Sequence, residues 1–182
     1  MMKLIPAGGS KLLTLIAAAA ACAALYMSGN ALAELADFLR FYSSDLFYPA
    51  LAHSKLPAEM PPLAALLSRH MLASFWFSFL FWLSAAALAV GVLLRREWAR
   101  RGAVAMCYLL AGAGLMMLIF PWLAVPRPLV YGGLELAPDF NAAVRAAALL
   151  VRVTSLAGGA LCLWWALALD RGAVRGEFVR KV

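Results

Sequence analysis

The sequence predicts an all-α integral membrane protein: a four-helix bundle with both termini on the cytoplasmic side and an amphipathic helical outer loop between the first and second spans. The chain has 182 residues, of which 65% are hydrophobic and 14% charged, and its mean hydropathy is +0.86. Soluble proteins are about half apolar and about a quarter charged. Long uncharged runs and an uneven division of lysine and arginine between the loops are the other two observations. We expect one membrane domain over residues 1–182.

Membrane spans are expected where apolar residues continue for about 20 positions, because a helix of that length crosses a hydrocarbon core of roughly 30 Å. Residues 71–94 and 102–125 are each free of charge. Pro121 lies near the end of the second run, where neighbouring helices can accommodate a kink. The first expected span, 12–27, is shorter and rich in alanine. The fourth covers 146–169 if Arg152 lies within it, and begins at Val153 if it does not.

The N-terminal segment has two interpretations. Lys3 and Lys11 precede its apolar run and Ala31-Leu32-Ala33 follows it, which is also the pattern of a cleavable signal peptide. The run is longer than the roughly 7–15 apolar residues that are usual in such peptides. A retained span is therefore favoured, while removal of residues 1–33 stays open.

The loop from about Ser28 to His70 contains a second helical pattern. Its apolar residues recur at steps of three and four, which predicts an amphipathic helix on the outer membrane surface or over the end of the bundle; they are Leu32, Leu35, Leu39, Tyr42 and Leu46. Prolines follow, and Pro62 is suited to begin the helix that becomes the second span. The many aromatic residues of this loop favour contact with lipid or with a partner protein.

Lysine and arginine predict the orientation, because they accumulate on the cytoplasmic side of bacterial membrane proteins. One side receives the N-terminus, the 95–101 hairpin and the C-terminal tail, with ten basic residues: Lys3, Lys11, Arg95, Arg96, Arg100, Arg101, Arg171, Arg175, Arg180 and Lys181. The other side has six: Arg40, Lys55, Arg69, Arg127, Arg145 and Arg152. Both termini are therefore expected in the cytoplasm of a bacterial cell, with the chain in its inner membrane as a multi-pass protein.

Several kinds of chemistry have no visible support. His53, Glu59 and His70 match no metal-ligand spacing, so neither a metal site nor a cofactor is expected. The four spans contain no Asp or Glu, which disfavours proton-coupled transport. The charged 95–101 hairpin suits anionic lipid headgroups, not nucleic acid, and Glu97 is expected to pair with Arg101 one turn later. No catalytic arrangement is apparent, so an enzyme is not the favoured interpretation.

Arg145 and Arg152 are the polar residues that need an explanation in an apolar helix. They begin a stripe of small or polar residues, which is typical of helix interfaces in lipid: Arg145, Ala148, Arg152, Ser155, Gly159, Cys162 and Ala166. We expect this stripe to face the other helices, so that Arg152 needs an acidic partner. The candidates are Asp45 and, foremost, Glu34, Asp37, Glu135 and Asp139. Arg152 extending outward through lipid remains an alternative.

A functional alternative to that ion pair is an outward-opening pocket for an anionic headgroup or small acid, lined by Arg145 and Arg152 and by Arg69 and His70. The favoured function is a non-enzymatic inner-membrane accessory or assembly protein. It would bind membrane lipid or a partner membrane protein through its outer loop and the fourth span. The alternative is an enzyme or carrier acting on an anionic or lipid-linked substrate at the outer leaflet. A homo-oligomeric channel, packed through Gly112, Gly114, Gly158 and Gly159, is a third possibility.

Overall fold

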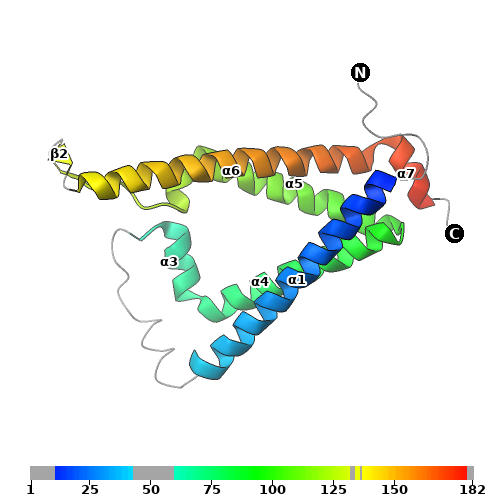
Figure 1. Ribbon diagram of the computed structural model, residues 1–182, viewed down its shortest axis with the longest axis horizontal. Helices are drawn as coiled ribbons and strands as arrows, with labels where there is room; N and C mark the ends of the chain where they lie inside the picture. Colours follow the sequence, from blue (N-terminus) through cyan, green and yellow to red (C-terminus); the bar gives the residue numbers. More distant parts are fainter. Residues whose placement is uncertain (1–10, 43–59, 132–133, 136, 180–182) are drawn as a thin grey trace. The chain divides into compact units, whose positions relative to one another are not determined.

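The computed structural model describes residues 11–42, 60–131, 134–135 and 137–179, and most of them are helical (Figure 1). Four helices are long and apolar enough to cross a membrane, as predicted for a multi-pass membrane protein: α1 (Lys11–Tyr42), α4 (Met71–Leu93), α5 (Glu97–Ile119) and α6 (Pro138–Asp170). Shorter elements connect or follow them: α3 (Pro62–Arg69), the 3-10 helix η1 (Pro121–Leu123), β1 (Val130–Tyr131), β2 (Leu134–Glu135) and α7 (Gly172–Val179). The two strands pair antiparallel, with Val130 opposite Glu135.

The chain divides into two compact units, which are described separately. The first unit contains Met1–Ser43, Leu72–Tyr108 and Trp164–Val182. The second contains Ser44–Met71 and Leu109–Leu163. Helices α5 and α6 are each divided between the two units.

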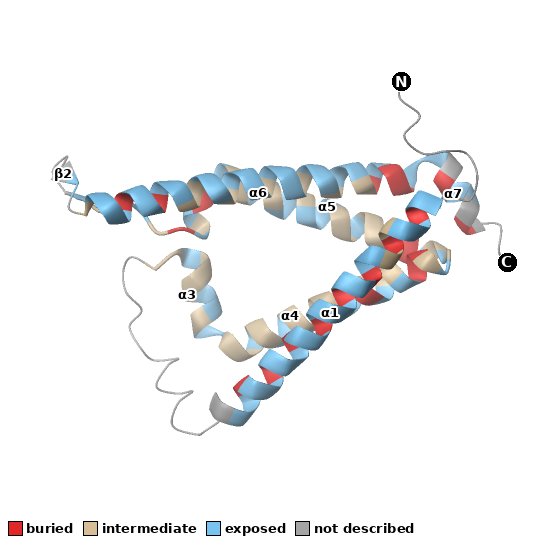
Figure 2. Cartoon of the chain, viewed as in Figure 1, coloured by how far each residue is buried: buried red, intermediate tan, exposed pale blue. Residues whose placement is uncertain are grey.

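Helix α1 corrects the prediction of a short first span followed by a separate amphipathic helix. It runs without interruption from Lys11 to Tyr42 and buries one seam with steps of three and four residues (Figure 2): Leu13, Ala17, Ala21, Ala24, Ser28, Ala31, Leu35 and Phe38. Small residues dominate this seam, as expected where helix backbones approach closely. Of the predicted amphipathic stripe, Leu35 is buried, whereas Leu32 and Leu39 are exposed and Leu46 lies outside the described residues.

The buried seam of α1 packs inside the first unit. Leu13 and Ala17 belong to one apolar cluster with residues from α4, α5, α6 and α7: Val92, Ala99, Leu169, Val174 and Phe178. At the other end of α1, the ring of Phe38 lies 4.9 Å from the ring of Phe75 in α4, centroid to centroid. Helix α1 therefore takes part in the core of this unit along its length.

A tight turn at residues 94–96 joins α4 to α5, so that residues 97–101 of the expected 95–101 hairpin belong to α5. The N–H of Arg96 donates to the carbonyl of Gly91, and the N–H of Arg95 donates to that of Val92. This is the hydrogen-bond pattern of a Schellman helix end, which requires a left-handed residue, and Arg95 has a φ of 55°. Arg95 is held there by a 2.9 Å hydrogen bond to Thr14 Oγ1 and by the ring of Phe178.

In the second unit, α5 and α6 meet at glycine. A Cβ added to Gly114 would lie 3.0 Å from the carbonyl oxygen of Ser155 and 3.4 Å from the Cα of Gly159. The predicted small stripe of α6 therefore does pack against another helix at Ser155 and Gly159. Gly112 and Gly158, in contrast, have open space where a Cβ would be.

Proline ends α5 earlier than the sequence predicted. The expected span 102–125 continued through Pro121, but α5 stops at Ile119 and Pro121 begins η1. The residue before a proline is disfavoured in the helical conformation, and Phe120 has left it, with φ −119° and ψ 63°. The chain after Phe120 is thereby released from the helix and forms the irregular segment that carries the site described next.

Candidate functional site

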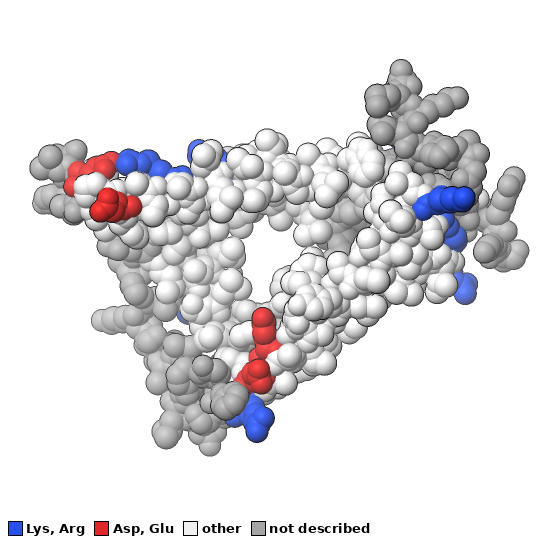
Figure 3. All heavy atoms as spheres, viewed as in Figure 1, with Lys and Arg blue, Asp and Glu red and all other residues white. Residues whose placement is uncertain are grey.

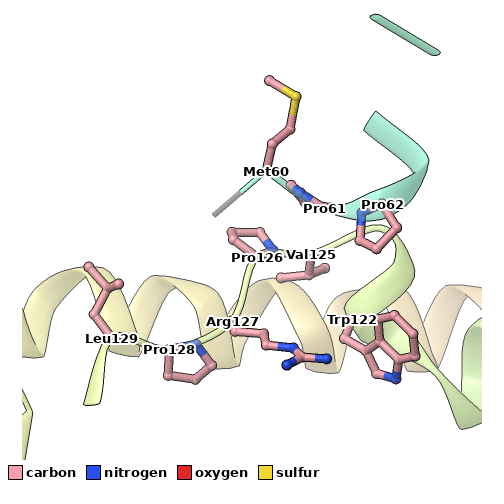
Figure 4. A pocket seen from close by; sticks show the side chains of 9 residues that line it. All are labelled: Met60, Pro61, Pro62, Trp122, Val125, Pro126, Arg127, Pro128 and Leu129. Atoms are coloured by element: carbon pink, nitrogen blue, oxygen red, sulfur yellow. The ribbon is translucent and has the colours of Figure 1, made fainter. Parts of the chain in front are cut away.

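A cavity of about 280 Å³ lies in the second unit where the start of α3 meets η1 and the segment after it (Figure 4). Its lining is apolar apart from one guanidinium group: Met60, Pro61, Pro62, Trp122, Val125, Pro126, Arg127, Pro128 and Leu129. Four prolines and one tryptophan stiffen these walls, because proline has a fixed φ and the tryptophan side chain has few rotatable bonds. The hollow is thus shaped largely by rigid residues.

Arg127 is the charged member of this lining. Its guanidinium carbon lies 5.4 Å from the ring centroid of Trp122, and in Figure 4 the side chain extends toward that ring. Such a cation–π contact orients the guanidinium while leaving its N–H donors available. Arg127 and Trp122 are both exposed. An arginine beside a tryptophan is suited to the interfacial region of a membrane, where both residue types place polar atoms near headgroups.

Asn141 fixes the segment that carries Arg127. Its side chain is completely buried; its Oδ1 accepts a 2.7 Å hydrogen bond from the N–H of Leu129, and its Nδ2 donates a 3.1 Å bond to the carbonyl of Leu129. The amide therefore satisfies both backbone groups of one loop residue, as a neighbouring strand would. Asn141 lies in the first turn of α6. Its bonds to Leu129 therefore attach the loop to that helix, at a position two residues after Arg127.

A second cavity, of about 170 Å³, lies between the same loop and α6. It is lined by Pro121, Trp122, Val125, Pro126, Arg127, Pro128, Val144, Arg145 and Ala148. Arg127 thus lines both cavities, and Arg145 joins it in the second. Arg145 Nη1 donates a 2.7 Å hydrogen bond to Glu135 Oε1, in an ion pair whose side chains are 59% and 39% exposed.

The structure places the predicted site residues unevenly. Arg145 and Glu135 are brought together, although Glu135 was proposed as a partner of Arg152. Arg69 is exposed at the end of α3, and His70 caps that helix, its N–H donating to Leu66 and Leu67. Asp139 is exposed in the first turn of α6. No wall formed jointly by Arg145, Arg152, Arg69 and His70 lines the two cavities above.

Arg152 does not take the inward direction that was predicted for it. Its side chain is exposed, and Val151 is the half-buried residue of that turn. The packed positions run through Val144, Ala148, Val151, Ser155 and Gly159, so the interface passes beside Arg152. The predicted stripe is therefore right at Ala148, Ser155 and Gly159, but it included Arg145 and Arg152 where Val144 and Val151 are the packed residues.

The other expected partners of Arg152 have different outcomes. Glu34 and Asp37 are exposed on α1, in the first unit, whereas Arg152 belongs to the second. Their pairing with Arg152 stays a prediction.

Asp45, His53 and Glu59 lie outside the described residues. Among the residues that the structure describes, no group of three or more His, Cys, Asp or Glu side chains is arranged to hold a metal ion.

Sequence reasoning did not single out Arg127, Trp122 or Asn141. Arg127 was counted only among the basic residues expected on the outer side. The available signal was the segment Pro126-Arg127-Pro128, since a charge between two prolines is held on a stiff chain. The role of Asn141 has no sequence signal, because it depends on a loop folding back onto α6.

Arg100 was also misjudged. It was grouped with the surface arginines of the hairpin, but it is 3% exposed. It forms two 2.8 Å bonds with Glu97 and a 3.0 Å bond with Asp170. The predicted pair of Glu97 with Arg101 is confirmed at 2.9 Å. These charges hold the start of α5 to the end of α6 inside the first unit, so we assign them to the fold and not to a site.

Comparison of the chain with protein-family models, with curated proteins and with solved structures found no match.

Proposed function

We propose that this chain is a non-enzymatic accessory or assembly protein of a bacterial inner membrane, which binds a membrane lipid at its outer side through the corner formed by Trp122 and Arg127. The observation that carries the proposal is the cavity of about 280 Å³ with one oriented cation in an apolar lining. Ligand sites are typically apolar hollows with a few placed polar groups. A lipid presents this combination, an apolar chain joined to a polar headgroup.

Binding is favoured over catalysis by the chemistry of the lining. Neither cavity is lined by a Ser, Cys, His, Asp or Glu side chain, and general acid–base or nucleophilic catalysis at neutral pH depends on such groups. Arginine stays protonated and acts through charge and hydrogen bonds. The alternative, an enzyme or carrier for an anionic or lipid-linked substrate at the outer leaflet, would use the same arginines but needs reactive groups from elsewhere.

The proposed orientation has both termini in the cytoplasm, with four spans. Most charged side chains visible in Figure 3 lie toward the ends of helices, and the exposed Arg152, in the middle part of α6, is an exception. This supports a membrane setting for the long helices, and the excess of lysine and arginine at the hairpin and tail supports the direction of insertion. Trp122 and Arg127 then belong to the outer interface. We propose that helix α1 is kept in the mature protein, and the contribution of Leu13 and Ala17 to the apolar cluster supports this.

The proposal is tested by asking which lipids stay with the purified full-length protein. We expect mass spectrometry under native conditions to show wild-type protein carrying phospholipid, with an intact mass that includes α1. Arg127→Gln should lower the bound anionic lipid by about tenfold, since a charge-assisted hydrogen bond contributes about 1.5 kcal/mol or more.

Arg69→Gln is the matched control, because Arg69 is also an exposed arginine of the second unit but lines neither cavity. It should retain lipid as the wild type does. Equal loss in both variants would show a general effect of surface charge, and wild-type protein that retains no lipid would contradict the proposed function.

A further inference from the structure

Two arginines share the smaller cavity without an acid in its lining. Arg127 and Arg145 are the ionisable residues among the nine that line it, and the other seven are Pro121, Trp122, Val125, Pro126, Pro128, Val144 and Ala148. Two like charges beside one apolar hollow repel each other, and an anion placed between them lowers that energy. The cavity is therefore favourable for a negatively charged group attached to an apolar one.

Glu135 satisfies only part of this charge. It pairs with Arg145 at 2.7 Å from strand β2, outside the cavity lining. Arg127 lies against the ring of Trp122, and that contact neutralises no charge. The cavity and its carboxylate together keep one net positive charge, which matches a singly charged phosphodiester. The apolar remainder of the lining suits the acyl chain of a phospholipid better than a free phosphate ion.

We propose that this cavity holds the phosphate of an anionic phospholipid beside Arg127 and Arg145, and that Glu135 competes with that phosphate for Arg145. This inference rests on the proposed lipid-binding function and names its ligand class and an internal competitor. The ion pair with Glu135 is displaceable, because exposed pairs contribute little to stability. Arginine binds phosphate oxygens through two parallel N–H groups. A phosphate can therefore displace the carboxylate of Glu135 from Arg145. The carboxylate of Glu135 thus occupies Arg145 in the lipid-free protein.

Glu135→Gln provides the test, with Asp139→Asn as its matched control. Both changes remove one exposed negative charge from neighbouring parts of the second unit, but only Glu135 contacts Arg145. We expect Glu135→Gln to raise the affinity of the purified protein for phosphatidylglycerol by about two- to fivefold, as loss of an exposed ion pair allows. Asp139→Asn should change it by less than a factor of two, and Arg145→Gln should lower it.

The two sources of phosphate are separated by adding soluble glycerol phosphate as competitor. We expect it to displace phosphatidylglycerol only weakly, since it lacks the chain. Equal gains in Glu135→Gln and Asp139→Asn, no gain in Glu135→Gln, or full displacement by glycerol phosphate would each overturn the inference. Equal binding of phosphatidylcholine and phosphatidylglycerol would overturn it too, while leaving the proposed lipid binding intact. Absence of any lipid binding would instead overturn the proposed function.

Discussion

A single buried arginine connects the start of α5 to the end of α6 in the first unit. Arg100 is bonded to Glu97, to Asp170 and, at 3.3 Å, to the carbonyl oxygen of Leu169. The acids are less buried, with side chains 26% and 58% exposed. Each bond is therefore partly weakened by solvent, but the guanidinium itself has lost its water and depends on all three partners.

Replacing Arg100 should destabilise the first unit more than replacing its neighbour. We expect Arg100→Gln to lower the free energy of unfolding in detergent by about 2 kcal/mol, since bonds to charged groups are lost together. Arg101→Gln should cost less than about 1 kcal/mol, because the side chain of Arg101 is 71% exposed and forms an exposed ion pair with Glu97. Unfolding titrations monitored by circular dichroism measure both. Equal stability of the two variants would refute the structural role given to Arg100.

Residue type in the sequence did not distinguish these arginines. Arg95, Arg96, Arg100 and Arg101 occupy one short hairpin, and all fit a cytoplasmic charge cluster. Arg100 is buried because the end of α6 packs against it, and the sequence of the hairpin holds no information about where α6 ends. The roles of Trp122, Arg127 and Asn141 were missed for the same reason, because Asn141 acts through Leu129, in the loop that returns to α6.

Helix contacts in the second unit depend on small residues at defined positions. Gly114 has a backbone oxygen of α6 in its way, and a backbone cannot move aside as a flexible side chain can. Figure 1 shows α5 and α6 running side by side, in agreement with this contact. The stripe of small residues was predicted correctly at Ser155 and Gly159, and the arginines were wrongly placed on it.

Gly114→Ala should therefore separate α5 from α6, and Gly112→Ala should not. We expect Gly114→Ala to cost about 1–3 kcal/mol, the usual range for forcing an extra group into a packed interface. Gly112→Ala introduces the same methyl group into open space and removes a flexible residue from a helix, so it should be neutral or stabilising. Thermal unfolding in matched detergent compares the pair. A loss in Gly112→Ala as large as in Gly114→Ala would contradict the assigned contact.

At the scale of elements, hydropathy predicted four long apolar helices, and the structure has them. Their ends were less predictable. The first span was predicted as 12–27, but α1 extends to Tyr42, because Ala31, Leu35 and Phe38 continue the same buried seam. The run 102–125 was cut at Ile119, because the hydropathy count gave no weight to the backbone restriction before Pro121.

At the scale of the whole molecule, two separate roles emerge for charge. In the first unit, Arg100 and its acids join the ends of α5 and α6 and serve the fold. In the second unit, Arg127 and Arg145 line cavities, and Glu135 balances one of them. The sequence favoured an ion pair for the arginines of α6 and offered a pocket for an anionic group as the alternative; Arg145 has an ion pair with Glu135 and also lines a cavity. The cavity itself depends on prolines far apart in the chain, Pro61 and Pro126 among them.

The central proposal is that lipid binds at the corner formed by Trp122 and Arg127, and photolabelling tests it most directly. Full-length protein in vesicles would be irradiated with a phosphatidylglycerol that carries a photoreactive group near its phosphate, and the labelled peptides identified by mass spectrometry. We predict labelling concentrated on residues 121–129, reduced in Arg127→Gln and unchanged in Arg69→Gln. Labelling that avoids this segment, or that is the same in all three proteins, would contradict the account.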